Sequence, residues 1–398
     1  MNKIHPKITE VPQWITALLA IACGVIVANL YYSQPLIGPI SKDTDLPLSS
    51  AGFIVTLTQI GYVLGLLFIV PLCDIIENRR LVSTVLMVAI GALVVTSLAR
   101  NAIIFLIATL FIGIGSVTAQ ILVPYASHLA AEERRGQVVG NVMSGLLLGI
   151  MLARPIASFI TDLWGWHAVF ILSAIMTSVL TLVLSFVLPR RKPSPTVHYG
   201  SLIRSMGFLF KTQTVLRRRA VYQACLFGAF SLFWTTIPLW LAQHFNLSQR
   251  GIALFALAGV AGAIAAPMAG RLADKGWTKS LTGLAIIIAI LSFAMTLLVK
   301  NASSLALTVF VIAAISLDMA VSGNLVLGQR AIYALGHEIR GRVNGVFMAV
   351  FFIGGAIGSA SGGWGYAHGG WMLASLFGIT MPVIALSYYF TERNNECI

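Results

Sequence analysis

The chain has 398 residues, of which 58% are hydrophobic and only 10% are charged, and its mean hydropathy is +0.89. A soluble domain carries about 25% charged residues, so lipid must be the solvent for most of this chain. The formal net charge of +13 does not indicate nucleic-acid binding, because the basic residues fall in short loops between apolar runs. The four cysteines have no metal-ligand spacing and indicate no disulfide framework.

Apolar runs near or above about 18 residues predict membrane-spanning helices. We place twelve of them, at 13–33, 50–72, 81–99, 102–124, 138–161, 166–188, 219–243, 250–270, 279–299, 303–327, 343–366 and 370–390. The first run is too long for the core of a signal peptide and has no evident cleavage site, so we expect it to be retained as a span.

One long polar connection follows the sixth span and begins with a Pro-Arg-Arg-Lys-Pro cluster. It divides the chain into a first half (residues 1–188), a linker (189–218) and a second half (219–398). Residues 201–210 of the linker allow two interpretations: a basic tether, or a short helix that lies on the membrane surface.

The lysines and arginines predict that both termini face the cytoplasm. With that orientation, 21 of the 26 Lys and Arg residues lie in cytoplasmic loops and tails, and Arg154 lies within a span. The opposite side then carries only Lys42, Arg100, Arg250 and Lys300. Cytoplasmic loops of membrane proteins are enriched in Lys and Arg, and the linker is therefore expected to be cytoplasmic as well.

The two halves repeat one another. The opening of the fifth span, Glu-Arg-Arg-Gly-Gln-Val-Val-Gly-Asn-Val-Met at 133–143, resembles Glu-Ile-Arg-Gly-Arg-Val-Asn-Gly-Val-Phe-Met at 338–348. Asp74 after the second span likewise corresponds to Asp274 after the eighth. Repeated six-span halves are typical of transporters with a substrate site between the halves near the bilayer midplane. The predicted fold class is an all-α membrane protein with 12 transmembrane helices in two pseudo-symmetric six-helix bundles.

The loop after the eighth span reads Gly-Arg-Leu-Ala-Asp-Lys-Gly over residues 270–276 and is followed by Lys279. It resembles the G-x-L-a-D-r-x-G-r-[RK] loop of the major facilitator superfamily (MFS), and the resemblance covers the whole chain. The first-half counterpart is degraded, with Val70 in the glycine position.

In that superfamily the loop carboxylate holds the cytoplasmic side shut by meeting a helix end and basic residues. An anion near a helix N-terminus gains up to about 1 kcal/mol, an interaction that a conformational cycle can make and break. The alternative is a tight turn with solvated charges. The cytoplasmic gate implied by the resemblance consists of Asp74, Arg79, Arg80, Gly270, Arg271, Asp274 and Lys275.

Further motifs are similar to those of bacterial drug or metabolite:proton antiporters and of a related exporter-like branch. They are Ala-Asn-Leu-Tyr-Tyr-Ser-Gln-Pro-Leu at 28–36, Thr-Gln-Ile-Gly-Tyr at 58–62 and Leu-Ala-Arg at 152–154. The chain departs from the antiporters at two positions. In the fourth span Leu110 stands where the antiporters have an intramembrane arginine, and in the fifth span Arg154 stands where they have the glycine before a proline. One interpretation is that the arginine has been relocated. The resemblance implies an exporter of the bacterial cytoplasmic (inner) membrane.

Arg154 and Asp318 are charged residues in the middle of apolar segments. A charge at that depth costs several kcal/mol, so such residues usually face a polar cavity. Burial disfavours the charged form of a carboxylate, and we predict that Asp318 takes up and releases a proton during transport. The alternative is a hydrogen bond to Ser316 or Ser322, or a permanent salt bridge.

Arg154 keeps its charge. We predict that it binds an anionic substrate group or stabilises a nearby carboxylate, and the two helices allow it to pair with Asp318. The alternative is a structural arginine beside Asp162.

Polar residues of other spans are candidates for lining the substrate site. They are Asn29, Tyr31, Tyr32, Gln34, Gln59, Tyr62 and Gln120 in the first half and Gln223, Trp234, Asn324 and Asn344 in the second. For each of them the alternative is a helix–helix hydrogen bond or an anchor at the membrane interface.

No phosphate-binding loop of Walker type occurs, so ATP is not the energy source within this chain. The seven histidines do not cluster with acids at metal spacing, and we expect no enzyme activity, cofactor or metal. The sequence predicts a proton-coupled exporter of small organic molecules that works by alternating access. The alternative is a proton-coupled importer of an anionic metabolite. The expected partners are a small-molecule substrate, protons and the lipid bilayer, and the protein is expected to be a monomer.

Overall fold

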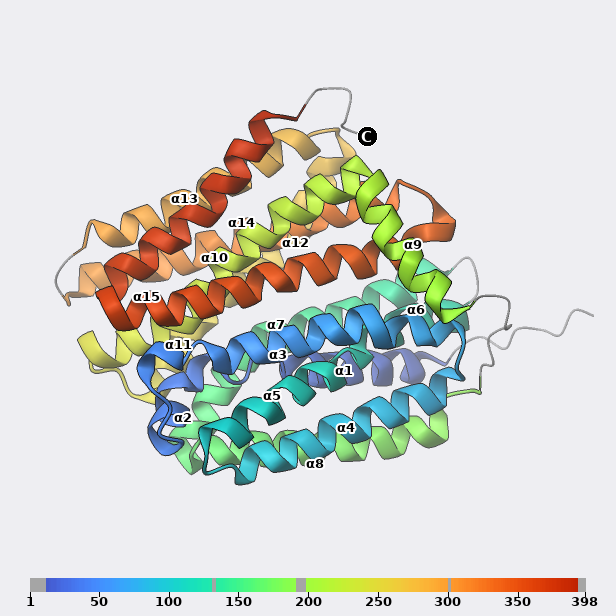
Figure 1. Ribbon diagram of the computed structural model, residues 1–398, viewed down its shortest axis with the longest axis horizontal. Helices are drawn as coiled ribbons and strands as arrows, with labels where there is room; N and C mark the ends of the chain where they lie inside the picture. Colours follow the sequence, from blue (N-terminus) through green and yellow to red (C-terminus); the bar gives the residue numbers. More distant parts are fainter. Residues whose placement is uncertain (1–11, 131–133, 191–197, 300–301, 393–398) are drawn as a thin grey trace, which may run out of the picture.

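The computed structural model describes residues 12–130, 134–190, 198–299 and 302–392, which are helical almost throughout (Figure 1). The helices before the linker are α1 (Gln13–Ala28), α2 (Ile37–Asp43), α3 (Phe53–Leu64), α4 (Asn78–Leu98), α5 (Ala102–Ser116), α6 (Thr118–Leu129), α7 (Arg135–Trp164) and α8 (Trp166–Val187). Those from the linker onward are α9 (Tyr199–Thr212), α10 (Thr214–His244), α11 (Gln249–Ala256), α12 (Gly262–Asp274), α13 (Thr278–Leu297), α14 (Ser304–Tyr333) and α15 (Arg340–Phe390).

The described helices supply the twelve predicted spans. Ten helical segments are long and apolar enough to cross a membrane, and α1 is a shorter apolar helix of 16 residues. The 51-residue α15 supplies two of the twelve spans, because its backbone leaves the helical conformation at Gly369 and Gly370. Gly370 has φ +58°, a conformation that glycine adopts without steric cost. The break lies between the eleventh and twelfth predicted spans.

Several spans are interrupted helices. The second span joins a 3₁₀ turn (Leu48–Ser50), α3, a π-helical turn (Gly65–Ile69) and another 3₁₀ turn (Val70–Asp74). The eighth span joins α11 to α12 through a 3₁₀ turn, Leu257–Ala261. Such irregular turns inside helices frequently mark functional sites, and the turn of the eighth span proves to face the buried charges described below.

Helices α1–α8 and α10–α15 form two bundles that lie against each other, blue to green below and yellow to red above in Figure 1. In the first bundle α1 packs on α7 and α4 on α8; in the second α10 packs on α15 and α13 on α14. Backbones touch where side chains are absent: a Cβ on Gly149 of α7 would lie 2.2 Å from the carbonyl oxygen of Gly24 in α1. Small residues at close helix crossings are typical of membrane bundles.

The two ends of the bundles differ. We call the end that holds α9 and the start of α4 the basic end, and the end that holds α2 and α11 the opposite end (Figure 1). Towards the opposite end the bundles meet, with α3 against α15 and α7 against α11. Asp162 Oδ1 there accepts from the backbone N–H of Arg250 at 3.2 Å. Nearer the middle, the hydroxyls of Thr56 and Ser359 lie 2.8 Å apart.

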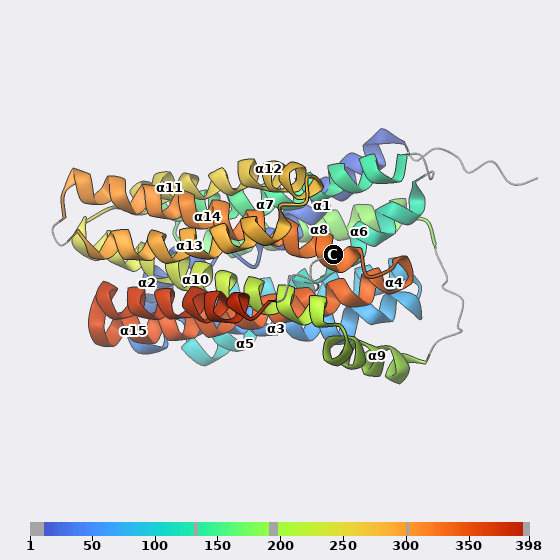
Figure 2. The ribbon, with the colours of Figure 1, turned by 90° about the horizontal axis from the view of Figure 1, so that it is seen from above.

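The linker is not a plain tether. Residues 199–212 form α9, which lies at the basic end against α10 and α15 (Figure 2). Helix α10 begins at Thr214, a few residues before the predicted start of the seventh span at residue 219. The reason is that three consecutive arginines precede the apolar run, and two of them, Arg218 and Arg219, are buried in the fold.

Candidate functional site

Arg154 and Asp318 come together between the two bundles. Arg154 lies on α7 and Asp318 on α14, and each is only 2% exposed. A Cβ placed on Gly259, in the turn of the eighth span, would lie 2.6 Å from Asp318 Oδ2 and 3.1 Å from Arg154 Nη1. The carboxylate and the guanidinium therefore lie against the same bare glycine.

The guanidinium of Arg154 is held by one amide and three rings. Its Nε donates to Gln34 Oε1 at 2.7 Å. Its Cζ lies 4.3 Å from the ring centroid of Trp234, 4.8 Å from that of Phe230 and 5.5 Å from that of Tyr31. Cation–π contacts of this kind are worth about 2 kcal/mol or more when they are desolvated. They hold a charge that lipid alone would not tolerate.

Asp318 is only half satisfied. Its Oδ1 accepts from the indole N–H of Trp234 at 3.0 Å. Asp318 Oδ2, Arg154 Nη2 and Gln34 Nε2 are buried and have no hydrogen-bond partner within the described ranges. Unpaired buried polar atoms cost free energy, more so when they carry charge. This site therefore has unused capacity to bind a proton, a water molecule or a substrate group.

Two of the alternative partners of these residues make other contacts. Ser316 donates to the backbone of its own helix, at the carbonyl of Ile312. Asp162 accepts from the backbone of Arg250, and Arg154 is buried away from it in the contacts described above. Sequence reasoning included Trp234 in the lining but did not identify it as the partner of Asp318.

Other predicted lining residues join helices rather than reach the charges. Gln59 Nε2 donates to Ser231 Oγ at 2.8 Å and so joins the two bundles. The Tyr62 ring lies 4.5 Å from that of Phe352, also across the bundles. Gln120 is partly buried on α6.

Several of these residues make contacts within one bundle. Asn29 Oδ1 accepts from Ser173 at 2.5 Å in the first bundle. In the second bundle Asn324 Nδ2 donates to Gln223 at 2.7 Å. Asn344 Oδ1 accepts there from a tyrosine hydroxyl, that of Tyr333, at 2.9 Å.

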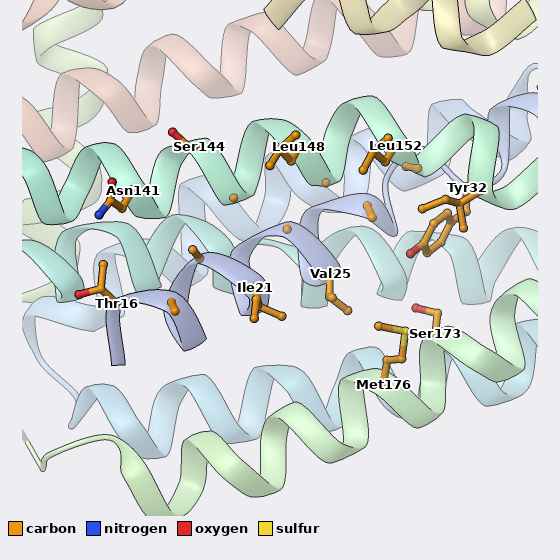
Figure 3. Close-up of a pocket in the computed structure, with 18 of the residues that line it drawn as sticks. Thr16, Ile21, Val25, Tyr32, Asn141, Ser144, Leu148, Leu152, Ser173 and Met176 are labelled. Carbon is orange, nitrogen blue, oxygen red and sulfur yellow. The ribbon is translucent and has the colours of Figure 1, made fainter. Parts of the chain in front are cut away.

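A separate groove of about 870 Å³ runs along the first bundle. Its walls come from α1, α7 and α8, and Figure 3 shows Ile21 and Val25 on α1, Leu148 on α7 and Met176 on α8 around it. Tyr32 lines the groove rather than the charged site. The groove belongs to one bundle only, whereas the charged site uses both.

The predicted gate residues lie at the basic end. Asp274 forms an ion pair with Arg330, whose Nη1 also donates to the carbonyl of Gly270 at 3.3 Å. All three belong to the second bundle, so this pair does not join the bundles. Asp74 Oδ1 accepts from the thiol of Cys73 at 3.8 Å, and Asp74 forms no ion pair within the described part of the chain.

The remaining gate residues are charged side chains near the same loops. They are Arg79 and Arg80 at the start of α4, Arg271 near the end of α12, and Lys275 just after it. Among the residues that the structure describes, the loop charges form no ion pair between the two bundles.

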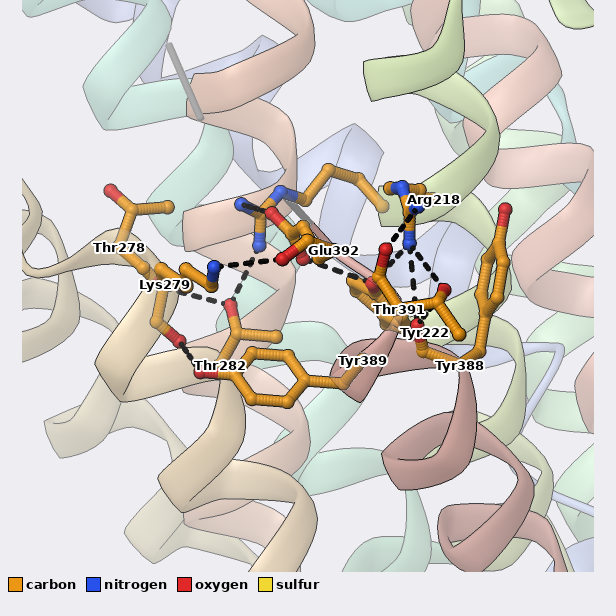
Figure 4. Close-up of polar contacts among 10 residues, drawn as sticks. Arg218, Tyr222, Thr278, Lys279, Thr282, Tyr388, Tyr389, Thr391 and Glu392 are labelled. Carbon is orange, nitrogen blue, oxygen red and sulfur yellow. Dashed lines mark hydrogen bonds and ion pairs between the residues drawn. The ribbon is translucent and has the colours of Figure 1, made fainter. Parts of the chain in front are cut away.

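A buried ionic cluster at the basic end escaped sequence reasoning (Figure 4). Arg219 Nη2 lies 3.3 Å from Glu392 Oε1, with side-chain exposures of only 4% and 1%. Tyr222 donates to Glu392 Oε2 at 2.9 Å, and Lys279 Nζ donates to the backbone carbonyl of Glu392 at 3.0 Å. The cluster ties the end of the twelfth span to α10 and α13. The signal in the sequence was an acid directly after the last apolar run.

We expect Glu392→Ala to lower the free energy of unfolding by about 3–5 kcal/mol, because a buried arginine loses its counter-charge. Equilibrium unfolding in mixed micelles measures the change. The matched control is Asp274→Ala, which removes an ion pair whose side chains are 67% and 46% exposed and should cost no more than about 1 kcal/mol. Equal effects of the two substitutions would contradict a stabilising role for the cluster.

Two bundles of apolar helices, with two opposite charges buried between them, define a multi-pass membrane transporter. The chain belongs to the Major Facilitator Superfamily, which it matches over residues 18–336. This confirms the superfamily and the fold class predicted from the sequence, and members of this superfamily are transporters rather than enzymes.

Individual relatives agree with this assignment. The chain is 39% identical over 378 residues to the uncharacterized transporter YgaY of Escherichia coli O157:H7, with 95% of each chain covered. It is 23% identical over 398 residues to the inner membrane transport protein YdhP of Escherichia coli K12, covering 95% of this chain and 96% of YdhP.

A solved structure has the same fold. It is that of a bacterial homolog to the human lysosomal transporter Spinster, in an inward-facing and occupied conformation. The TM-score is 0.74 at 15% identity, and the match covers 95% of this chain and 96% of that chain.

Proposed function

We propose that this transporter exports small organic molecules in exchange for protons, by alternating access, with Asp318 as the proton carrier. The observation that carries the proposal is the half-satisfied carboxylate of Asp318, 2% exposed, with a permanent cation beside it on the other bundle. A buried carboxylate with an unpaired oxygen is stable as an anion only while a cation is close, and otherwise gains by taking up a proton.

Movement of the bundles would switch Asp318 between its charged and its protonated form. Arg154 belongs to the first bundle and Asp318 to the second, so separation at the opposite end removes the cation from the carboxylate. Asp318 would then bind a proton from that side. When the bundles close again, Arg154 returns and favours release of the proton towards the basic end. The two halves, residues 1–188 and 219–398, are the units that we propose to move.

The direction of the cycle follows from the orientation that we propose, with the basic end and both termini in the cytoplasm of a bacterial cell. Each proton that enters then gains about 2.3 kcal/mol per 100 mV of membrane potential, enough to drive substrate outward. At the cytoplasmic side Asp74 and Asp274, with Arg79, Arg80, Arg271 and Lys275 nearby, would hold the bundles together while the other side is open.

The substrate site that we propose lies around the unpaired atoms of Gln34, Arg154 and Asp318. The rings of Tyr31, Phe230 and Trp234 form its apolar wall. This lining fits a small organic molecule that combines an apolar or aromatic body with a polar group. Gln59 and Tyr62 border the same interface between the bundles.

Inverted membrane vesicles with an acidified lumen and an internal pH indicator test the proposal. Lipophilic cations, sugars and carboxylates are added in turn to the outer medium, which then faces the basic end. We expect members of one class to raise the lumenal pH and to accumulate inside. Uptake of that class into whole cells, abolished by a protonophore, would instead show a proton-coupled importer, which the unpaired Nη2 of Arg154 would suit if the substrate is an anion.

A further inference from the structure

The side chains of Asp318, Arg154 and Trp234 converge on Gly259. A Cβ built on it would lie 2.6 Å from Asp318 Oδ2, 3.1 Å from Arg154 Nη1 and 3.2 Å from Trp234 Cζ2. A contact below about 3 Å to a Cβ is an overlap, so a neighbouring atom must shift to relieve it. Any other residue at this position would force the carboxylate or the guanidinium to move.

The internal repeat shows that this arrangement, a glycine between two charges, is specific to one corner of the molecule. Aligning Asp74 with Asp274 places Gln59 opposite Gly259, and aligning 133–143 with 338–348 places Ser359 opposite Arg154. Gln59 and Ser359 also face each other, with Ser359 Oγ 3.5 Å from Gln59 Oε1. One corner between the bundles is thus filled by a neutral polar pair, and the related corner by a glycine and two charges.

We propose that Gly259 is a positioning residue: its missing side chain lets Arg154 and Asp318 share one space when the bundles close at the opposite end. The charged or titratable groups that face Asp318 are Arg154 from α7 and Tyr31 from the end of the first span. Closure brings the permanent charge of Arg154 to the carboxylate across Gly259. What Gly259 does for proton coupling rests on the proposed function, whereas the effect of Gly259 on closure of the bundles does not.

Disulfide formation between cysteines introduced at Asp162 and Arg250 measures closure at the opposite end, because these exposed residues are in contact there. With Gly259→Ala we expect the rate of cross-linking to fall at least about fivefold, as overpacking a close contact predicts. Gly323→Ala is the matched control, since a Cβ there would lie 3.6 Å from the Cβ of Ala269, an ordinary contact. The single-cysteine variants correct for the native cysteines.

The double variant Gly259→Ala/Asp318→Ala separates this claim from general damage to the eighth span. Asp318→Ala alone is the reference, because it leaves Arg154 without its counter-charge in the same way as the double variant does. Removing the carboxylate removes the overlap at Oδ2, so adding Gly259→Ala to Asp318→Ala should slow cross-linking no further. If Gly259→Ala cannot be purified, equal yields of monodisperse protein from Asp318→Ala and from the double variant carry the same conclusion. Unchanged cross-linking in Gly259→Ala, or an equal further loss in the Asp318→Ala background, would overturn the proposal.

Proton release from the acidified vesicles distinguishes this inference from the proposed function. If both hold, Gly259→Ala loses substrate-driven proton release and Gly323→Ala keeps it. If the wild-type protein releases no protons with any substrate, the exchange mechanism fails while the cross-linking result still decides the role of Gly259. If Gly259→Ala releases protons at the wild-type rate despite slower cross-linking, closure does not depend on this contact during transport, and the proposal is wrong.

Discussion

The Asp318→Asn variant is expected to accumulate in the membrane at the wild-type level and to lose substrate-driven proton release to background. The amide has the shape of the carboxylate, and its oxygen can still accept from the Trp234 indole, as Oδ1 does at 3.0 Å. It can neither bind nor release a proton, so the exchange cycle has no carrier. The measurement is the rise of lumenal pH in acidified inverted vesicles after addition of a transported compound.

Two comparisons make this result specific. Substrate counterflow without a pH gradient should persist in Asp318→Asn, because exchange of substrate for substrate needs no net proton movement. Asp162→Asn is the matched control: Asp162 is exposed, and an asparagine keeps the oxygen that accepts from the backbone of Arg250. Undiminished pH-driven transport in Asp318→Asn would refute the assignment of the proton carrier.

Arg154→Gln is expected to abolish pH-driven transport and to destabilise the protein. Without the guanidinium, an ionised Asp318 is a buried charge with no counter-charge, which costs about 3–5 kcal/mol. The carboxylate then stays protonated on both sides of the cycle and cannot release its proton. Transport in the same vesicles and unfolding in mixed micelles measure the two effects.

A double-mutant cycle tests whether these effects arise from the pair. Arg154→Gln/Asp318→Asn contains no buried charge, so we expect its stability to exceed that of Arg154→Gln while transport stays absent. Arg154→Lys keeps the charge but cannot reproduce both the hydrogen bond to Gln34 and the stacking on Trp234, and it should give partial activity. Strictly additive stabilities would show that the two side chains act independently.

The spans could be predicted because lipid leaves few choices. A backbone in hydrocarbon must satisfy its own hydrogen bonds, so each long apolar run becomes a helix, and the division between the eleventh and twelfth spans coincides with a glycine break. The structure differs from the sequence prediction where charged residues are buried. Arg218 and Arg219 look like loop residues in the sequence, yet Glu392 and its neighbours let them enter the fold.

The candidate site was predicted only in part, for a similar reason. Two charges in apolar runs identified Arg154 and Asp318, and their cost in lipid made them candidates. Their meeting depends on how α7 packs against the turn of the eighth span, where Gly259 lies between the two side chains. A glycine in an apolar run carries no signal of its own. Its importance appears only when the side chains around it are placed.

Infrared difference spectroscopy of the reconstituted protein tests the central claim most directly, since it observes protonation of the carboxyl group itself. Between about pH 9 and about pH 5, acidification should produce a carboxylic-acid band that is absent from Asp318→Asn. In Arg154→Gln the band should already be present at the higher pH, because the cation that favours the charged form is gone. An unchanged band in Asp318→Asn, or no protonation of Asp318 in this range, would contradict the account.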